Sequence, residues 1–215
     1  MITVLLVDDH AVVREGYRRL LEQDATIQVV GEAENSVDAC ERAMALEPQV
    51  IVMDIALPGV SGIEAMRRIL ARRPQQSVLM FSMYDDAIFP SRALKAGACG
   101  YVSKASAPEV LVDAVSAVAR GERYLSPDVR KVIAHHTSTH AKSAVNALTA
   151  REFEVLRLLA RGETVKHIGE KLGLSEKTVA NHQSAIREKL GARNGVQLAR
   201  VAAELGLSQE SLPGM

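Results

Sequence analysis

The stretch from Val50 to Gly59, which reads VIVMDIALPG, constrains the fold of this chain more than any other segment. Four consecutive apolar residues, Val50–Met53, lead directly into the carboxylate of Asp54 and then into a Pro-Gly turn. An apolar run of this length is typical of a strand buried on both faces, as in a parallel sheet covered by helices. Asp54 would then lie at the carboxyl end of a buried strand, where α/β folds place their ligands.

Residues 1–122 are predicted to form an α/β domain in which five strands alternate with five helices. This alternation implies right-handed βαβ units and a five-stranded, parallel, doubly wound sheet of the flavodoxin-like type, with helices on both faces. The strands are expected at residues 1–7, 27–33, 50–53, 77–81 and 100–102, and the helices at residues 11–23, 36–46, 61–73, 87–96 and 108–120.

Polar side chains follow every one of these strands except the second, and they are Asp8, Asp9, Asp54, Ser82 and Lys104. Because the carboxyl ends of parallel strands meet at one edge of a sheet, these side chains are expected to lie together. Three carboxylates this close repel one another and require a countercharge, and hard oxygen ligands suit Mg²⁺. We therefore predict a magnesium-assisted phosphoryl-transfer site, with Asp54 as the nucleophile and Lys104 as a cation for the same phosphate.

The residues at this edge also allow other roles. Asp8 and Asp9 could cap the helix that follows them, and Lys104 could be a solvated surface lysine. An aspartyl-phosphate hydrolase of the haloacid-dehalogenase type is an enzyme alternative, but it expects a second acid two residues after the nucleophile, where this chain has Ala56. His10, next to the acids, is more typical of a helix surface than of a metal ligand.

The charge of the chain is divided unevenly, although it sums to zero. Residues 1–122 carry 12 Lys and Arg against 17 Asp and Glu, whereas residues 123–215 carry 14 against 9. An acidic first part and a basic second part favour two domains with different partners. Since no apolar run reaches the roughly 20 residues of a membrane span and the two cysteines lack metal-site spacing, we expect a cytoplasmic protein with reduced thiols and no membrane partner.

A change in composition separates the two domains. Residues 123–146 are polar, which is typical of a linker, and a short helix is expected within them at residues 129–134. From residue 147 to residue 208 the apolar residues return at helical spacing. We predict an all-α domain of four helices there, the last of them at residues 196–205.

The start of this second domain predicts a helix-turn-helix. Thr149 and Glu152 have the spacing of a capping box, which marks the beginning of the first helix. After a short second helix the chain turns at Gly173, and Ser175 is expected to cap a third helix that runs to Leu190. Two helices joined by a tight glycine turn, the second of them capped by serine, form this motif.

The third helix divides into an apolar and a polar face. Val179, Ile186 and Leu190 recur at helical spacing and are expected to point to the core. Cations, hydroxyls and the free N–H groups of a helix N-terminus bind DNA phosphates, and short polar side chains can read bases. A solvated helix would have similar charges, so the pattern alone does not decide between the two. The candidate DNA-binding residues are Lys177, Thr178, Asn181, His182, Ser184 and Lys189.

Over their whole length, residues 1–122 resemble the receiver domain of bacterial response regulators. The matching residues are Asp8 and Asp9, Met53 and Asp54, Pro58 and Gly59, Ser82, and Gly97, Ala98, Cys99, Gly100, Tyr101 and Lys104. The resemblance implies that Asp54 accepts a phosphoryl group, and that Asp9, Asp54 and the carbonyl of Ala56 hold Mg²⁺ while Asp8 acts through water. Ser82 and Tyr101 resemble the pair in which the hydroxyl moves to the phosphoryl group and the ring turns inward.

Residues 148–207 resemble the LuxR-type helix-turn-helix of the NarL/FixJ response regulators. The resemblance implies a transcription regulator that is no enzyme beyond its own phosphoryl transfer and dephosphorylation. A sensor histidine kinase would phosphorylate Asp54, and the protein would then bind double-stranded DNA as a homodimer. The matching residues are Leu148, Thr149, Arg151, Glu152, Glu154, Val155, Leu156, Gly162, Glu163, Ile168, Leu172, Leu174, Ser175, Lys177, Thr178, Val179, Asn181, His182, Ile186, Lys189, Leu190 and Gly191.

The chain departs from the pattern of these families at three positions. Ala105 follows Lys104 where many receivers have proline, which leaves the geometry of that peptide bond open. Ala180 stands where relatives often have a basic residue. Gly169 replaces a usual alanine, at a cost to the helix of up to ~1 kcal/mol.

Two functional points stay open in the sequence. Val196, Ala199 and Ala203 form a small apolar face on the fourth helix, which suits dimerisation but also suits a core. The alternatives to a phosphorylation-controlled regulator are a DNA-binding protein whose receiver ignores phosphate, and a helix-turn-helix that binds RNA or protein.

Overall fold

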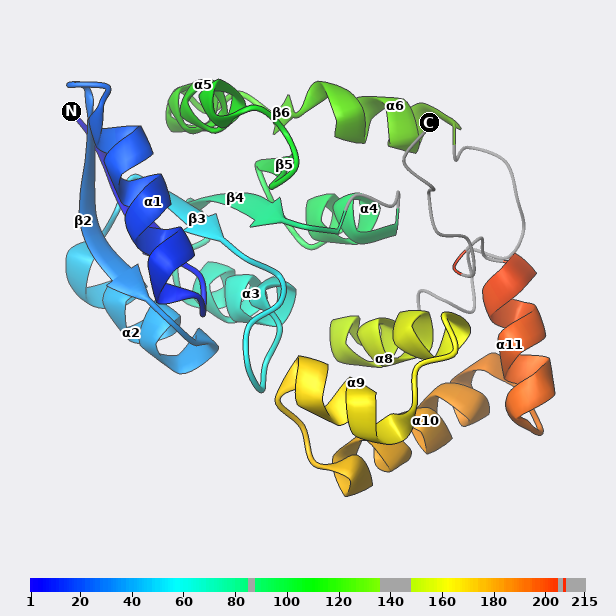
Figure 1. Ribbon diagram of the computed structural model, residues 1–215. Coiled ribbons are helices and arrows are strands. Elements are labelled where there is room, and N and C mark those ends of the chain that lie inside the picture. Colours follow the sequence, from blue (N-terminus) through cyan, green and yellow to red (C-terminus); the bar gives the residue numbers. More distant parts are fainter. Residues whose placement is uncertain (85–87, 136–147, 205–206, 208–215) are drawn as a thin grey trace. The chain divides into compact units, whose positions relative to one another are not determined.

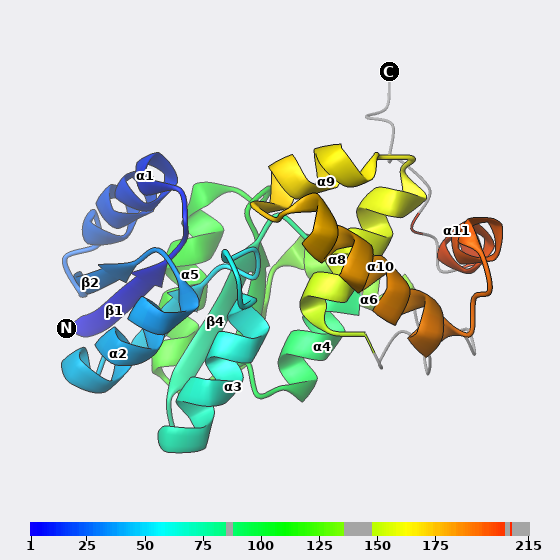
Figure 2. The ribbon, with the colours of Figure 1, turned by 90° about the horizontal axis from the view of Figure 1, so that it is seen from below.

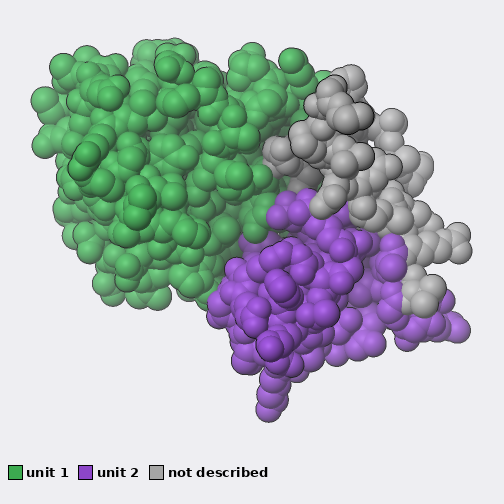
Figure 3. All heavy atoms as spheres, in the orientation of Figure 1, with its two compact units in different colours: residues 1–138 green, residues 139–215 purple. Residues whose placement is uncertain are grey.

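The computed structural model describes residues 1–84, 88–135, 148–204 and 207. The chain folds into two compact units, residues 1–138 and residues 139–215 (Figure 3). The first unit is an α/β domain and the described part of the second is helical, as the sequence predicts (Figure 1). Among the described helices, none is long and apolar enough to cross a membrane.

Strands and helices alternate along the first unit, and the ten elements predicted for residues 1–122 are all present. The strands are β1 (Ile2–Val7), β2 (Ile27–Ala33), β3 (Val50–Met53), β4 (Ser77–Ser82), β5 (Gly100–Ser103) and β6 (Tyr124–Leu125). The helices are α1 (Ala11–Glu22), α2 (Ser36–Leu46), α3 (Gly62–Arg72), α4 (Ile88–Lys95), α5 (Pro108–Ala119) and α6 (Pro127–His135).

The strands form one parallel sheet in the order β2-β1-β3-β4-β5-β6. Helices α1 and α5 lie on one face, and α2 and α3 lie on the other (Figures 1 and 2). The predicted number of five strands was wrong, because the short strand β6 pairs with β5. Gly100 permits this pairing, since a Cβ atom at position 100 would lie 2.6 Å from the carbonyl oxygen of Tyr124. A strand of two residues is too short to be recognised from its periodicity.

Part of the segment expected to be a linker belongs to the first unit. Strand β6 and helix α6 follow α5, and hydrogen bonds join the start of α6 to the end of β5 and to the loop after it. The backbone N–H of Ser103 donates to Ser126 Oγ at 3.4 Å, and the Ser106 hydroxyl donates to Asp128 Oδ1 at 2.9 Å. Residues 136–147 lie outside the described residues.

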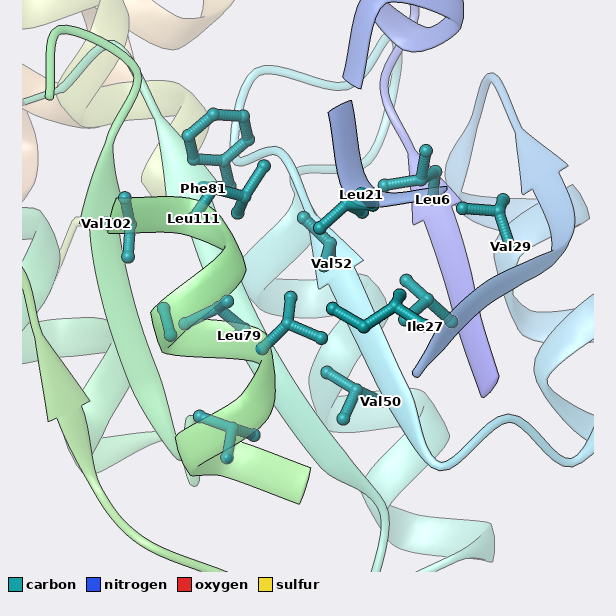
Figure 4. Packing of buried hydrophobic residues seen from close by; sticks show 14 residues of the cluster. Leu6, Leu21, Ile27, Val29, Val50, Val52, Leu79, Phe81, Val102 and Leu111 are labelled. Atoms are coloured by element: carbon teal, nitrogen blue, oxygen red, sulfur yellow. The ribbon is translucent and has the colours of Figure 1, made fainter. Parts of the chain in front are cut away.

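The sheet is buried on both faces, as predicted from its central strand. The four residues of β3 are each at most 2% exposed. On the side of α1 and α5, one cluster joins Leu79 and Val102 of the strands to Leu21 of α1 and Leu111 of α5 (Figure 4). The core is mainly aliphatic, since the chain has only three Phe, four Tyr and no Trp. This core holds the carboxyl ends of the strands in register.

The second unit contains α8 (Ala150–Ala160), α9 (Val165–Leu172), α10 (Glu176–Leu190) and α11 (Gly195–Glu204). The predicted capping box at Thr149 and Glu152 is confirmed, with both reciprocal hydrogen bonds present. Ser175 caps α10 by accepting from the N–H of Thr178 at 3.1 Å. The chain turns between α9 and α10 at Gly173, whose φ of 62° is left-handed. The helix-turn-helix is therefore built as predicted.

Gly169 has a structural role that its helix propensity does not reveal. A Cβ atom at this position would lie 2.7 Å from the carbonyl oxygen of Leu174, in the turn that follows α9. The N–H of Leu174 donates to the Gly169 carbonyl at 2.8 Å, so the turn closes directly on this residue. The glycine thus permits the tight turn, which offsets its cost to the helix.

Candidate functional site

The backbone places the predicted site residues next to one another at the carboxyl edge of the sheet. The N–H of Asp54 donates to the Val7 carbonyl at 2.9 Å, and the N–H of Lys104 donates to the Ser82 carbonyl at 2.9 Å. These bonds extend the strand pairing by one residue beyond β3 and β5. Asp8, Asp54, Ser82 and Lys104 therefore start from neighbouring backbone positions, as the sequence predicts.

Lys104 lies between two carboxylates. Its ammonium donates to Asp8 Oδ2 at 2.5 Å and to Asp54 Oδ2 at 2.6 Å. The side chains of Lys104 and Asp8 are 7% exposed and that of Asp54 is 5% exposed, so the three charges are largely removed from water. Charges buried in this way must be paired, which excludes the alternative of a solvated surface lysine. No peptide bond in the described residues is cis, so Lys104 and Ala105 are joined in trans.

Burial and the neighbouring charges have opposite effects on the pKa values of Asp54 and Lys104. Burial raises the pKa of the Asp54 carboxyl above its ordinary value, and the Lys104 ammonium opposes the rise without reversing it. Burial by itself would lower the pKa of Lys104, but the carboxylates of Asp54 and Asp8 outweigh it, so this pKa is raised. Lys104 is thus held firmly in its charged form, whereas the charge of Asp54 depends on Lys104.

Asp8, Asp9 and Asp54 form an acidic edge of the sheet, and Asp9 and His10 lie on its solvent side. The side chain of Asp9 is 30% exposed, and its Oδ1 lies 2.8 Å from His10 Nδ1. Asp8 Oδ1 accepts from the backbone N–H of His10 at 2.8 Å. The N-cap residue of α1 is His10, without a side-chain cap, so Asp8 and Asp9 do not cap this helix. Ligand atoms of Asp8, Asp9 and His10 lie within 4.8 Å of one another.

The donor set at this edge fits a hard cation. Among the described residues, Asp54 Oδ1 accepts a hydrogen bond from the N–H of Ala56 at 3.2 Å, and Asp54 Oδ2 accepts from Lys104. Each carboxylate oxygen has two lone pairs, so capacity for a metal bond remains. Together with Asp8 and Asp9, the edge offers oxygen ligands of the kind that Mg²⁺ takes.

Ser82 and Tyr101, the predicted switch pair, are both fully buried. They meet at one residue: the Tyr101 hydroxyl donates to the Tyr84 carbonyl oxygen, and the N–H of Tyr84 donates to Ser82 Oγ at 3.4 Å. The ring of Tyr101 therefore points into the domain in this structure. Residues 85–87, which follow Tyr84, lie outside the described residues.

Gly62 was not singled out from the sequence, although it contacts the backbone of Asp54. A Cβ atom at position 62 would overlap the carbonyl oxygen of Asp54 and would lie 2.8 Å from its carbonyl carbon. The N–H of Gly62 donates to the Ile55 carbonyl at 2.9 Å, so the first residue of α3 is bound to the loop of Asp54. In the sequence, the sign of this close contact was a glycine at the start of a predicted helix, where glycine has no conformational role of its own.

The candidate DNA-binding residues lie mostly on one exposed face of α10. Lys177, Asn181 and Ser184 are exposed, whereas Thr178 and His182 are half-buried. Of the predicted inner face, Val179 and Ile186 are fully buried, whereas Leu190 is half-buried. Along α10 the polar face begins with the cation of Lys177. Smaller polar side chains follow it, and they are Thr178, Asn181, His182 and Ser184.

Lys189 and His182 differ from the other candidates in their surroundings. The Lys189 ammonium donates to both carboxylate oxygens of Glu152 at 2.7 Å, and thereby ties the end of α10 to the capping box of α8. Burial lowers the pKa of the His182 imidazole, which favours its neutral form. Ser184 and Thr178 also have partners within the domain, since the Ser184 hydroxyl donates to the Ala180 carbonyl at 3.1 Å and the hydroxyls of Thr178 and Ser175 lie 2.8 Å apart.

Replacing Gly62 with alanine is expected to displace the Asp54 loop and to lower the free energy of unfolding by about 1–3 kcal/mol, since the new methyl group overlaps backbone atoms. Urea denaturation measures the change. Gly16→Ala is the matched control, because a Cβ atom at position 16 of α1 meets nothing within 4 Å and helix propensity favours alanine. Equal stability of Gly62→Ala and the wild type would contradict the close approach.

Replacing Lys104 with methionine is expected to lower the free energy of unfolding at neutral pH by about 3 kcal/mol, because Asp54 loses its buried partner. Loss of Lys104 also raises the pKa of Asp54 further. The destabilisation should therefore shrink as the pH falls and Asp54 takes up a proton.

The raised pKa of Lys104 predicts that the wild type loses stability at alkaline pH. The stabilisation from Lys104 is fully present below the ordinary lysine pKa and is lost as the pH rises through the raised value. Denaturation curves measured from acid to alkaline pH test both the acid and the alkaline prediction. Lys95→Met is the control, because Lys95 is exposed. A loss in Lys104→Met that does not depend on pH would contradict this account.

Comparison with known proteins assigns both units. The response regulator receiver domain matches residues 4–116, and the luxR family of bacterial regulatory proteins matches residues 146–202. Response regulator UvrY of Escherichia coli strain K12 is 36% identical over 209 residues, which cover 96% of each chain. Response regulator GacA of Pseudomonas aeruginosa is 36% identical over 96% of this chain and 98% of its own.

Solved structures agree with this assignment. A LuxR-family two-component response regulator from Aurantimonas sp. SI85-9A1 is 43% identical, covers 62% of this chain and 95% of its own, and has a TM-score of 0.61. The two-component response regulator RcsB in its complex with DNA is 29% identical, covers 95% of this chain and 98% of its own, and has a TM-score of 0.60. The chain therefore belongs to the NarL/FixJ family of response regulators, with a receiver domain followed by a LuxR-type DNA-binding domain.

Proposed function

We propose that this response regulator controls transcription through phosphorylation of Asp54, with a sensor histidine kinase as the phosphodonor and double-stranded DNA as the target. The observation that carries the proposal is the position of Lys104 between Asp8 and Asp54 at the carboxyl edge of the sheet. Phosphoryl transfer is catalysed mainly by positioning and by neutralisation of charge, and this arrangement supplies both. The protein catalyses only phosphoryl transfer to Asp54 and the later hydrolysis of its own acyl phosphate.

The transfer uses Asp54 in its carboxylate form. One carboxylate oxygen bonds to the phosphorus of the kinase phosphohistidine, the P–N bond breaks, and the histidine nitrogen keeps the electron pair and takes up a proton. Lys104, which donates to Asp54 Oδ2 before the reaction, then donates to an oxygen of the new phosphoryl group. Because the lysine is buried, water screens its charge little.

The same edge would hold Mg²⁺ during this transfer. Asp9, Asp54 and the carbonyl of Ala56 are the proposed ligands, and Asp8 would act through a water molecule. When bound, Mg²⁺ would supply positive charge against the negative charge of the phosphoryl group. Asp54 Oδ1 accepts only a 3.2 Å hydrogen bond from Ala56 among the described contacts, which supports its availability as a ligand.

Ser82, Tyr84 and Tyr101 are the residues we propose to respond to the phosphoryl group. A movement of the Ser82 hydroxyl toward the phosphoryl oxygens would break its 3.4 Å contact with the N–H of Tyr84. Tyr84 is also bound through its carbonyl to the Tyr101 hydroxyl. A local change of charge would therefore reach Tyr101 through one shared residue, as in other two-state switches.

The second unit would bind DNA through α10, as a dimer and in the cytoplasm. Lys177 and the capped N-terminus of α10 suit phosphates, and Asn181 and Ser184 suit base edges. The related RcsB has been solved as two dimers bound to two parallel DNAs, which supports a dimer here. Of the proposed dimer face, Ala199 is exposed, whereas the side chains of Val196 and Ala203 lie outside the described residues.

Selection of duplexes from a random DNA pool tests the control by phosphate. With acetyl phosphate and Mg²⁺, the wild type should enrich a palindromic site that it does not enrich without them, and Asp54→Asn should enrich nothing in either condition. Glu41→Gln removes an exposed carboxylate of α2 and should behave as the wild type. Equal enrichment in all lanes would indicate a receiver that ignores phosphate, and no enrichment in any lane would contradict DNA binding.

Two substitutions in α10 separate phosphate contact from base reading. On the selected site, Lys177→Ala should weaken binding to all sequences alike and reduce the salt dependence, with a log–log slope smaller by about 1. Asn181→Ala should cost about 1–3 kcal/mol on that site and relax its sequence preference. Titrations of fluorescent duplexes at several salt concentrations measure both. The same slope in Lys177→Ala and the wild type would remove Lys177 from the interface.

A further inference from the structure

Lys104 has a third neighbour besides its two carboxylates. The Nζ atom lies 5.8 Å from the centroid of the Phe81 ring, above its face. An ammonium within about 6 Å of an aromatic ring is attracted by the negative face of the π system, and the attraction grows when water is excluded. Since the Lys104 side chain is only 7% exposed, little water reaches the cation to weaken this attraction.

Phe81 is held in place by Tyr17. Its side chain belongs to the core cluster on the α1 and α5 side, beyond Leu79 along β4, and is 5% exposed (Figure 4). The two rings lie 4.6 Å apart at 78°, an edge-to-face pair that fixes their orientation. The pKa of Tyr17 is raised, mainly by burial, and its further influences are Lys104, Asp8 and Asp54. Tyr17 therefore lies within the field of the acidic edge.

Phe81 is an aromatic residue in a mainly aliphatic core. The chain has three Phe and four Tyr among 215 residues, and most of the core cluster that contains Phe81 is aliphatic. Only an aromatic face adds attraction for a cation. Phe81 also directly precedes Ser82 in β4. Two consecutive residues therefore supply the ring beside the Lys104 cation and the hydroxyl of the site.

We propose that Tyr17 and Phe81 form an aromatic support that positions the Lys104 ammonium at the acidic edge of the sheet. The two residues act through Lys104 and do not touch the reacting atoms, so they are positioning residues. The inference rests on the proposed function for its effect on phosphorylation, but the position of the lysine is independent of that function.

Nuclear magnetic resonance of the full-length protein tests the position itself. The ring current of Phe81 should shift the ε-methylene protons of Lys104 upfield in the wild type. Phe81→Leu should abolish the shift, Phe81→Tyr should keep it, and Tyr17→Leu should reduce it by loosening the ring. Leu79→Val is the matched control, because it alters the same strand and the same cluster away from Lys104. An unshifted ε-methylene in the wild type would overturn the proposal.

Phosphorylation by acetyl phosphate with Mg²⁺ tests the consequence. Phe81→Leu should react about three- to thirtyfold more slowly than the wild type, and Phe81→Tyr should recover most of the rate. Equal rates of Phe81→Leu and Leu79→Val, or no recovery in Phe81→Tyr, would overturn the positioning role. Should Phe81→Leu fail to fold, Tyr17→Leu replaces it in both measurements. Absence of phosphorylation in the wild type would contradict the proposed function, while the ring-current shift would still decide the position of Lys104.

Discussion

The buried ion pairs of Lys104 with Asp8 and Asp54 are the interaction on which the first unit depends. Three parallel strands bring these residues together from positions far apart in the chain, and the hydrogen bonds of the sheet place them within one residue of the strand ends. Removal of charge from water is costly unless partners are present, so each member of this group requires the others. The same mutual dependence makes the site sensitive to any change in its charge.

The surroundings of Lys104 connect this charge to the rest of the domain. Gly62 brings the start of α3 against the Asp54 backbone, and Phe81 with Tyr17 links the lysine to α1. Hydrogen bonds from Ser103 and Ser106, on either side of Lys104, reach the segment that leads into α6. These bonds join the segment that carries Lys104 to the start of α6.

The second unit is organised by capping and by close approach of the backbone. Thr149 and Ser175 fix where α8 and α10 begin, and Gly169 allows the turn between α9 and α10 to close. The pair of Lys189 with Glu152 fastens the end of α10 to the start of α8. These contacts fasten α10 to α8 and α9 within this unit and leave the polar face of α10 exposed.

The sequence by itself determined the alternation of strands and helices, the capped helix-turn-helix and the polar residues at the strand ends, because each of these depends on local periodicity or on a local hydrogen bond. Only the tertiary structure decided the sixth strand, since two residues have no periodicity and pair only where Gly100 admits them. It also decided the partners of Lys104 and Lys189 and the contact of Gly62 with Asp54. Which side chain neutralises a charge, and which backbone atoms touch, depend on distances between segments remote in sequence, and no local pattern encodes those distances.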